Sequence, residues 1–297
     1  MGFRMHHLTR SHIMLMMANV GFSFILVFST LLRDSGISSF QQVLFRVILA
    51  ILIVLALNKC QIRIRKEDLG HFMVIGIIFS LFLLTALSAI ALGCSVPVAT
   101  ALIHTQPLFT SVIAMISGRE RVSIKKFPPI LIGIIGVFIV GGIDLRNFSL
   151  ANVGVPLAIL AGLLYAVYLF LKRVEKGYRP LQALFNTFIF AAPFTLIFWP
   201  FLMAFIKNPL ITGLTVPNYY QFFLLVLLAS VSTVAPYGLL NYVKNHEVSP
   251  TAEGMVLLID PAFSLFWAMF ILGQYATSFQ YFGVFLILIS ALMVLIS

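Results

Sequence analysis

Charged side chains are scarce in this sequence, and that scarcity excludes most kinds of protein. Only 9% of the 297 residues are Asp, Glu, Lys or Arg, and 61% are hydrophobic. A water-soluble domain carries roughly 25% charged and about 45–50% apolar residues, so a soluble fold is excluded. Lys and Arg outnumber Asp and Glu by 19 to 9. They form no basic stripe with interleaved aromatic residues, which argues against a nucleic-acid partner.

Cysteines and the motifs of enzymes are also scarce. The two cysteines, Cys60 and Cys94, are expected near opposite faces of a membrane, too far apart for a disulfide. The sequence has no H-E-x-x-H, no G-x-S-x-G, no Walker loop and no Cys/His cluster with metal-ligand spacing. We therefore expect no enzyme, no bound metal and no cofactor.

Long apolar runs are abundant instead. They are about 18 to 25 residues long, enough to cross a hydrocarbon core of about 30 Å as helices. Several begin with a proline, as at Pro180 and Pro250, where the first turn of a helix has no N–H bond to lose. The first run is too long for the apolar part of a signal peptide, so it is interpreted as a span. The predicted spans are 11–32, 39–58, 70–92, 96–117, 127–142, 153–171, 181–206, 219–243, 250–272 and 279–296.

The basic residues alternate between the two sides of these spans. One side collects fifteen Lys and Arg residues, the other has only Arg33, Arg146 and Lys207, and Arg46 lies inside a span. Because short cytoplasmic loops carry the excess of Lys and Arg, both termini are predicted to be cytoplasmic, with residues 1–10 as the N-terminal segment. The expected location is a cell (inner) membrane.

Two stretches of the sequence repeat. The segment 102–109 reappears as 256–263, with Pro107 matching Pro261, and the segment 36–41 resembles 177–182. Chance matching between apolar helices is the alternative explanation. Each half, 11–142 and 153–296, holds five spans, so the second must insert upside down relative to the first. The predicted fold is an all-α integral membrane protein with ten transmembrane helices in two inverted five-helix repeats.

Local motifs in both halves carry a family resemblance. The second span contains Ser-Ser-Phe-Gln-Gln-Val-Leu-Phe-Arg (38–46), and the segment 107–136 combines Pro-Leu-Phe, a loop glutamate and paired glycines. The segment 261–290 repeats this pattern less closely, with Gln274 where a glutamate is usual and Ser290 matching a glycine. Together these motifs resemble the drug/metabolite transporter superfamily, specifically EamA-type ten-helix transporters, over nearly the whole chain. The resemblance implies export or exchange of amino acids, their derivatives or other small metabolites.

Three formally charged residues lie inside the predicted spans: Arg46, Glu253 and Asp260. Each is costly in hydrocarbon and must face protein, a partner charge or water. Glu253 and Asp260 are two helical turns apart, so one face of the ninth span should carry both and line a cavity. Asp260 lies about 15 Å into its span, just before a proline that loosens the helix, and is the candidate substrate or proton site. The alternatives are a structural pair between Asp260 and Arg46, a snorkelling Arg46, and a Glu253 that complements the helix dipole.

The repeat extends the candidate site to the first half. Gln106 matches Asp260 in the repeat and is expected in the same midplane cavity. His104 points roughly 160 degrees away from Gln106 on a helix, and is either a proton carrier or an interhelical hydrogen-bonding residue.

Aromatic and amide side chains complete the list of candidates. Tyr237 follows Pro236, which interrupts the eighth span, and could stack on a substrate. Trp267 lies one heptad beyond Asp260 and is either an aromatic wall or a lipid-interface anchor. Asn19, Tyr165 and Asn241 are further candidates, although most single polar residues in such bundles only join helices.

The leading hypothesis is a secondary transporter whose inverted halves rock about a midplane cavity lined by Asp260, Gln106 and Tyr237. The sequence has no ATP site, so a gradient of protons or of a counter-substrate would supply the energy. The expected partners are a small-molecule substrate and the lipid bilayer, whereas the oligomeric state stays open. Uptake or exchange of a nucleotide-like or cationic metabolite is an alternative, and an intramembrane enzyme using Asp260 and His104 is a remote one.

Overall fold

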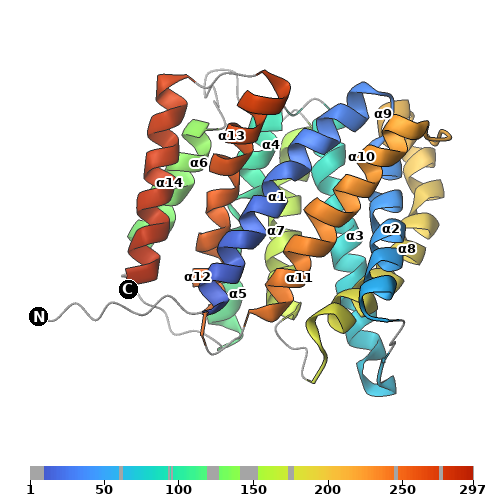
Figure 1. Cartoon of the computed structure of the whole chain (residues 1–297). Helices are drawn as coiled ribbons and strands as arrows, with labels where there is room; N and C mark the ends of the chain where they lie inside the picture. Colours follow the sequence, from blue (N-terminus) through green and yellow to red (C-terminus); the bar gives the residue numbers. More distant parts are fainter. Residues whose placement is uncertain are drawn as a thin grey trace, which may run out of the picture.

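The computed structural model of this chain is a bundle of helices that run up and down between two faces (Figure 1). The structure describes residues 10–59, 63–92, 94, 96–118, 127–140, 153–172, 177–243, 247–273 and 277–296, and these contain no strand. Eight helices or consecutive helical runs are long and apolar enough to cross a membrane, and two shorter apolar stretches, 127–140 and 278–290, accompany them. The predicted all-helical membrane architecture is confirmed.

The ten predicted spans correspond to helices in the same order. The first half contains α1 (Arg10–Asp34), α2 (Ser39–Leu57), α3 (Leu69–Ala91), α4 (Val96–Ile103), α5 (Gln106–Ile116) and α6 (Phe127–Val140). The second half contains α7 (Gly154–Leu171), α8 (Pro180–Phe205), the short α9 (Pro209–Thr212), α10 (Tyr219–Ala229), α11 (Ala235–Tyr242), α12 (Pro250–Val256), α13 (Asp260–Leu272) and α14 (Ser278–Ile296).

Local chemistry fixes where several of these helices begin. The Ser38 hydroxyl accepts a hydrogen bond from the backbone N–H of Gln41 at the start of α2. Asn218 and Gln221 form a reciprocal capping box at the start of α10. These side chains satisfy backbone N–H groups that have no partner in the first turn of a helix. Pro180 and Pro250 open α8 and α12, as the sequence predicts.

Helix packing shows the inverted relationship between the halves. In Figure 1, α1 leaves the face where the chain ends, whereas α7 approaches it, so the first helices of the halves are antiparallel. Helix α1 packs against α10, α11 and α13 of the second half, and α7 packs in the same way against α3, α4 and α5 of the first. The equivalent helices α2 and α8 contact each other, as do α6 and α14. This reciprocity is expected of two inverted repeats. Residues 141–152 lie outside the described part, and the boundaries of the halves stay a prediction.

Glycines let α6 and α14 approach closely. A Cβ atom on Gly136 would lie 2.7 Å from the carbonyl oxygen of Gly283, and a Cβ on Gly283 would lie 2.8 Å from that of Gly136. Ser290, which matches a glycine in the repeat, donates a hydrogen bond of 2.8 Å to the carbonyl of Pro129. Small residues and hydroxyl bonds at helix contacts are typical of membrane bundles, where lipid offers no hydrophobic driving force for association.

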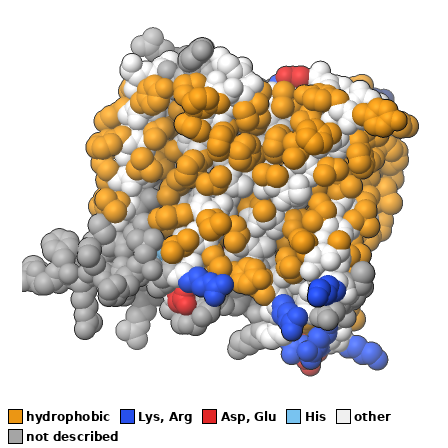
Figure 2. Space-filling model, in the orientation of Figure 1, with side chains coloured by type: hydrophobic (Ala, Val, Ile, Leu, Met, Phe, Trp, Pro, Cys, Tyr) orange, Lys and Arg blue, Asp and Glu red, His pale blue; other side chains and the backbone are white. Residues whose placement is uncertain are grey.

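The surface is consistent with a lipid environment. Hydrophobic side chains cover the visible flank of the molecule, while Lys and Arg gather at the edge where α1 begins and α14 ends (Figure 2). Ile116 and Phe205 are 83% and 85% exposed. Exposure of such large apolar side chains is unfavourable in water but not in lipid. Many of the loop charges counted in the sequence, such as those at 119–126 and 173–176, lie outside the described residues, as does Cys60. Assignment of this edge to the cytoplasm stays a prediction.

Candidate functional site

A central cavity of about 90 Å³ lies between the two halves of the bundle. The first half contributes residues of α1 to α4 and the second half residues of α7, α11 and α13. Its polar lining consists of Arg46, Thr100, His104, Tyr165, Tyr237 and Asp260. Five of these six were sequence candidates; Thr100 is the exception.

Two broken helices place charged groups at this cavity. In the fourth span α4 ends at Ile103 and α5 begins at Gln106, and in the ninth span a 3₁₀ turn, Leu257–Ile259, separates α12 from α13. Both breaks precede the repeated prolines. A proline inside a helix lacks a backbone N–H donor, and its ring clashes with the carbonyl group of the preceding turn, so the helix is distorted there. Discontinuous helices near the middle of the membrane are typical of transporter substrate sites. The breaks present His104 and Asp260, one from each half, to the same space.

His104 and Asp260 form a contact between the halves. His104 Nε2 lies 3.1 Å from Asp260 Oδ2, and the two side chains are only 9% and 16% exposed. His104 Nδ1 lies 2.9 Å from the carbonyl oxygen of Thr100, which can only accept, so Nδ1 carries a hydrogen. A hydrogen bond between Nε2 and the carboxyl group then requires one more proton, bound to either partner. With that proton bound, the two side chains together carry no net charge.

Arg46 does not pair with Asp260, so that structural alternative is wrong. Its Nε donates to Thr233 Oγ1 and its Nη2 donates to the carbonyl of Ser232 at 3.0 Å. The side chain is only 1% exposed and does not snorkel to the surface. In the described part of the chain, Arg46 forms no ion pair.

A π-helical segment, Ser230–Val234, supplies both partners of Arg46. Such segments widen one turn and release backbone carbonyls, and they occur frequently at functional sites. Thr233 Oγ1 also donates to the carbonyl of Leu228 at 2.7 Å, which fixes the hydroxyl that receives Arg46. The predicted interruption of the eighth span before Tyr237 is therefore present. Sequence reasoning missed Thr233, although the polar run from Ser230 to Thr233 inside an apolar span was a usable signal.

An aromatic floor, defined here as Phe79, Tyr168, Phe188 and Tyr237, lies beside the cavity on the side of the termini. The Tyr237 ring meets Phe79 and Tyr168 edge to face, with centroids 5.0 and 5.7 Å apart. Phe79 lies one turn before the cavity residue Phe82 on α3, and Tyr168 lies one turn after Tyr165 on the oppositely directed α7. All four floor residues are at most 1% exposed, so this layer is tightly packed.

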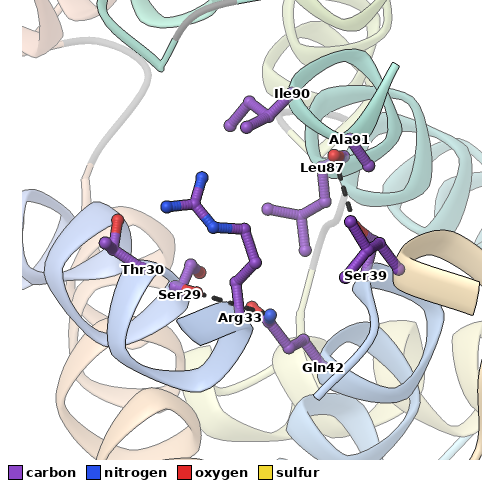
Figure 3. A pocket seen from close by; sticks show the side chains of 9 residues that line it. Ser29, Thr30, Arg33, Ser39, Gln42, Leu87, Ile90 and Ala91 are labelled. Atoms are coloured by element: carbon purple, nitrogen blue, oxygen red, sulfur yellow. Dashed lines mark hydrogen bonds between the residues drawn. The ribbon is translucent and has the colours of Figure 1, made fainter. Parts of the chain in front are cut away.

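A second cavity, the outer vestibule, lies toward the opposite face. It measures about 230 Å³ and its polar lining is Ser29, Thr30, Arg33, Ser39 and Gln42. Arg33 extends into it from α1, opposite Leu87 and Ile90 of α3 (Figure 3). Leu87 and Ile90 also line the central cavity, so these two apolar side chains border both cavities. The sequence candidates did not include the vestibule, although Ser29 and Arg33 are one helical turn apart.

Gln106 does not line the central cavity, so its predicted position is wrong. It is fully buried, and its Nε2 donates to the carbonyl of Gly254 at 3.0 Å while its Oε1 accepts from Thr110 at 3.0 Å. Gln106 opens α5 after the break and faces α12, whereas His104 lies within the break and faces Asp260. Gln106 and Asp260 match in the sequence repeat, but their side chains have different surroundings in the structure.

Glu253 also lies away from Asp260 and does not line the cavity. Its Oε1 lies 2.6 Å from Lys172 Nζ, and both side chains are buried. Lys172 also donates to the carbonyl of Leu240, which ties α7, α11 and α12 together. The 3₁₀ turn between Glu253 and Asp260 advances by about 120 degrees per residue instead of about 100, so the expectation of one shared face is wrong.

The remaining candidates join helices. Trp267 donates from Nε1 to Ser23 Oγ at 2.9 Å and stacks on Phe24, with centroids 4.4 Å apart, and it does not line the cavity. Asn19 donates to the carbonyl of Val256 at 3.1 Å, and Asn241 donates to the carbonyl of Pro180 at 3.3 Å. No group of three or more His, Cys, Asp or Glu side chains in the described residues could hold a metal ion.

Comparisons with known proteins agree with this architecture. The chain matches the EamA-like transporter family over residues 9–142 and again over 152–296. A solved structure described only as "Crystal structure of protein" has a TM-score of 0.70 and 16% sequence identity, over 93% of this chain and 95% of that chain. At this identity the likeness shows the fold alone. No curated protein sequence matches the chain. Because the family match covers both halves, the chain belongs to the EamA-like transporter family.

Proposed function

We propose that this membrane transporter moves a small metabolite, an amino acid or a derivative, by alternating access around the central cavity. One observation carries the proposal: the cavity lies between the inverted halves, with a layer of side chains toward each face. On one side this layer is the aromatic floor, and on the other it is Leu87 and Ile90, which border both cavities. Rocking of the halves would open these layers alternately.

The contact between His104 and Asp260 is the proposed coupling element. Removal of the shared proton would leave a lone pair on Nε2 facing a carboxylate, and the hydrogen bond would be lost. The other polar side chains that face this space are Arg46, Tyr165, Tyr237 and Thr100. Since His104 and Asp260 belong to opposite halves, binding and release of one proton would change how the halves hold together. A proton gradient is thus the proposed energy source.

The proposed direction is export or exchange. If the face with the termini is cytoplasmic, the vestibule opens to the outside, and a solute released past Leu87 and Ile90 would enter it directly. Uptake of a cationic metabolite has less support. Among the described residues Asp260 is the only carboxylate that lines the cavity, and His104 already occupies one of its oxygens.

Counterflow in proteoliposomes tests the proposal. Vesicles loaded with a mixture of L-amino acids should accumulate external ¹⁴C-labelled amino acids only when they contain the protein. Ala86 lines the cavity, so Ala86→Leu should fill the space and reduce counterflow at least about tenfold. Ala204 on α8 is exposed on the lipid-facing surface, and Ala204→Leu is the matched control that should retain it. Equal counterflow with Ala86→Leu and wild type, or none with wild type, would contradict the proposal.

A further inference from the structure

We infer that the cargo of the central cavity carries a carboxylate group and that Arg46 is the side chain that binds it. This inference rests on the proposed function and specifies the chemistry of the cargo. It follows from four features of the cavity: the burial of Arg46, the neutralisation of the other charges, the way Arg46 is held, and a contrast with Arg33.

The first feature is a buried cation that no acidic side chain neutralises. Arg46 is 1% exposed, and within the described ranges no carboxylate lies within ion-pair distance of it. A cation in the middle of a membrane is costly and is normally compensated by an opposite charge or by water. A cargo that brings its own negative charge would provide this compensation.

The second feature is that the neighbouring acids already have cationic or proton-sharing partners. Asp260 contacts His104 at 3.1 Å, and with their shared proton these two side chains carry no net charge. Glu253 contacts Lys172 at 2.6 Å, away from the cavity. Arg46 therefore leaves the cavity lining with a net positive charge, which favours an anionic group over a cationic one.

The third feature is the orientation of the guanidinium group. Thr233 and Ser232 accept from Nε and Nη2, and these two bonds hold the plane of the group from one side. A guanidinium has five N–H donors, and the fork of two parallel donors matches a carboxylate. Because Arg46 lines the cavity, the donors beyond these two bonds are available to a solute there. A lysine would lack the fork, so an arginine at this position favours a planar anion.

The fourth feature is the contrast with the arginine of the vestibule. Arg33 lines the outer vestibule (Figure 3). Its Nε and Nη2 both donate to Asp34 Oδ1, at 3.1 and 3.0 Å. Arg33 therefore has an acidic partner beside it in the chain. Arg46 differs, because among the described residues no carboxylate lies within ion-pair distance of it.

The size of the cavity limits the cargo. Pockets for drug-sized ligands measure about 300–1,000 Å³, whereas this cavity measures about 90 Å³ in the conformation described here. The walls beside Arg46 are apolar and aromatic, and include Phe22 and Phe82. A small carboxylate with an apolar body, rather than a nucleotide or a polyanion, fits these properties.

Matched pairs of ligands test the inference in the purified full-length protein. L-amino acids and short monocarboxylates are compared with their amides, which have nearly the same shape and no negative charge, by thermal shift. A ligand that binds the folded state raises the melting temperature. At least one carboxylate should raise it, and its amide should require an about tenfold or higher concentration for the same shift.

Variants of Arg46 assign the effect to this side chain. Arg46→Gln should abolish the shift, and Arg46→Lys, which keeps the charge but loses the fork, should weaken binding about tenfold. If Arg46→Gln does not fold, the thermal shift is measured with Arg46→Lys and with Thr233→Val, which removes the acceptor of Arg46 Nε. Both should bind the carboxylate more weakly than wild type does. Lys207→Gln, which removes an exposed positive charge in the loop before α9, should bind as wild type does.

Three outcomes would overturn the inference. These are equal binding of a carboxylate and its amide, unchanged carboxylate binding by the Arg46 variants, and a screen in which no carboxylate raises the melting temperature. Counterflow separates this failure from failure of the proposed function. Counterflow of a neutral or cationic amino-acid derivative that is independent of Arg46 would leave transport intact and remove only the carboxylate requirement.

Discussion

His104 Nε2 lies 3.1 Å from Asp260 Oδ2, although the two residues are 156 positions apart and belong to opposite halves of the bundle. His104 lies within the break of the fourth span and Asp260 directly follows the break of the ninth, so the contact joins the two broken helices. A hydrogen bond at this place requires a proton on one of the two side chains. The first prediction follows from this relationship.

Asp260→Asn keeps the shape of the side chain and removes its ability to bind and release a proton. The variant should exchange substrate down its gradient in proteoliposomes but lose accumulation driven by a pH gradient. His104→Gln should have the same effect, and the double variant should be no worse than either, because the two side chains act as one unit. Wild-type accumulation by Asp260→Asn would remove this residue from the coupling mechanism, and a variant that loses mainly thermal stability would indicate a structural role.

The buried ion pair of Lys172 and Glu253 should matter for stability rather than for transport chemistry. Glu253→Gln leaves the Lys172 ammonium, 2.6 Å from Glu253 Oε1 in the wild type, buried without this counter-charge. A loss of about 3–5 kcal/mol in the free energy of unfolding is expected.

Thermal unfolding in detergent measures this loss. Lys172→Met combined with Glu253→Met should recover part of the stability, because neither charge of this pair is left. A Glu253→Gln protein with wild-type stability and no transport would instead place Glu253 in the transport mechanism.

The contact between α6 and α14 should not tolerate a larger side chain. Gly136→Val adds a Cβ atom that would lie 2.7 Å from the carbonyl oxygen of Gly283, and the backbone there cannot move away cheaply. We expect a loss of about 1–3 kcal/mol in the free energy of unfolding, the usual effect of overpacking. Gly70→Ala on α3, where a Cβ would meet nothing within 4 Å, is the control and should be as stable as wild type or slightly more stable. Similar melting temperatures for both variants would contradict the close approach.

The location of the termini follows from the basic residues. Helices α1 and α14 begin and end at the same face, where Lys and Arg gather on the described surface (Figures 1 and 2). A reporter fused after Ser297 should therefore be active only if it functions in the cytoplasm. A C-terminal tag that is accessible from outside intact cells would reverse the predicted orientation, and with it the direction in which the vestibule opens.

The sequence alone determined the all-helical membrane architecture and the order of its helices. Hydrophobic length, basic residues between spans and proline at helix starts are local properties, and each span is stable in a membrane by its own composition. The breaks before Pro107 and Pro261 were also predictable, because proline removes a backbone donor wherever the chain folds. The inverted relationship also followed from the count of five spans per half, because an odd number of crossings starts the second half on the opposite side of the membrane.

Only the tertiary structure decided which polar side chains meet. Sequence spacing placed Gln106 and Asp260 in one cavity, yet Gln106 bonds to Gly254, and His104 takes the position opposite Asp260. The two opposite charges inside spans also suggested Arg46 as a partner of Asp260, whereas Arg46 bonds to Thr233 in the π-helical segment. The physical reason is that a 3₁₀ turn, a π turn and a proline break each change the direction of the side chains that follow. A count of about 100 degrees per residue holds only within an unbroken α-helix.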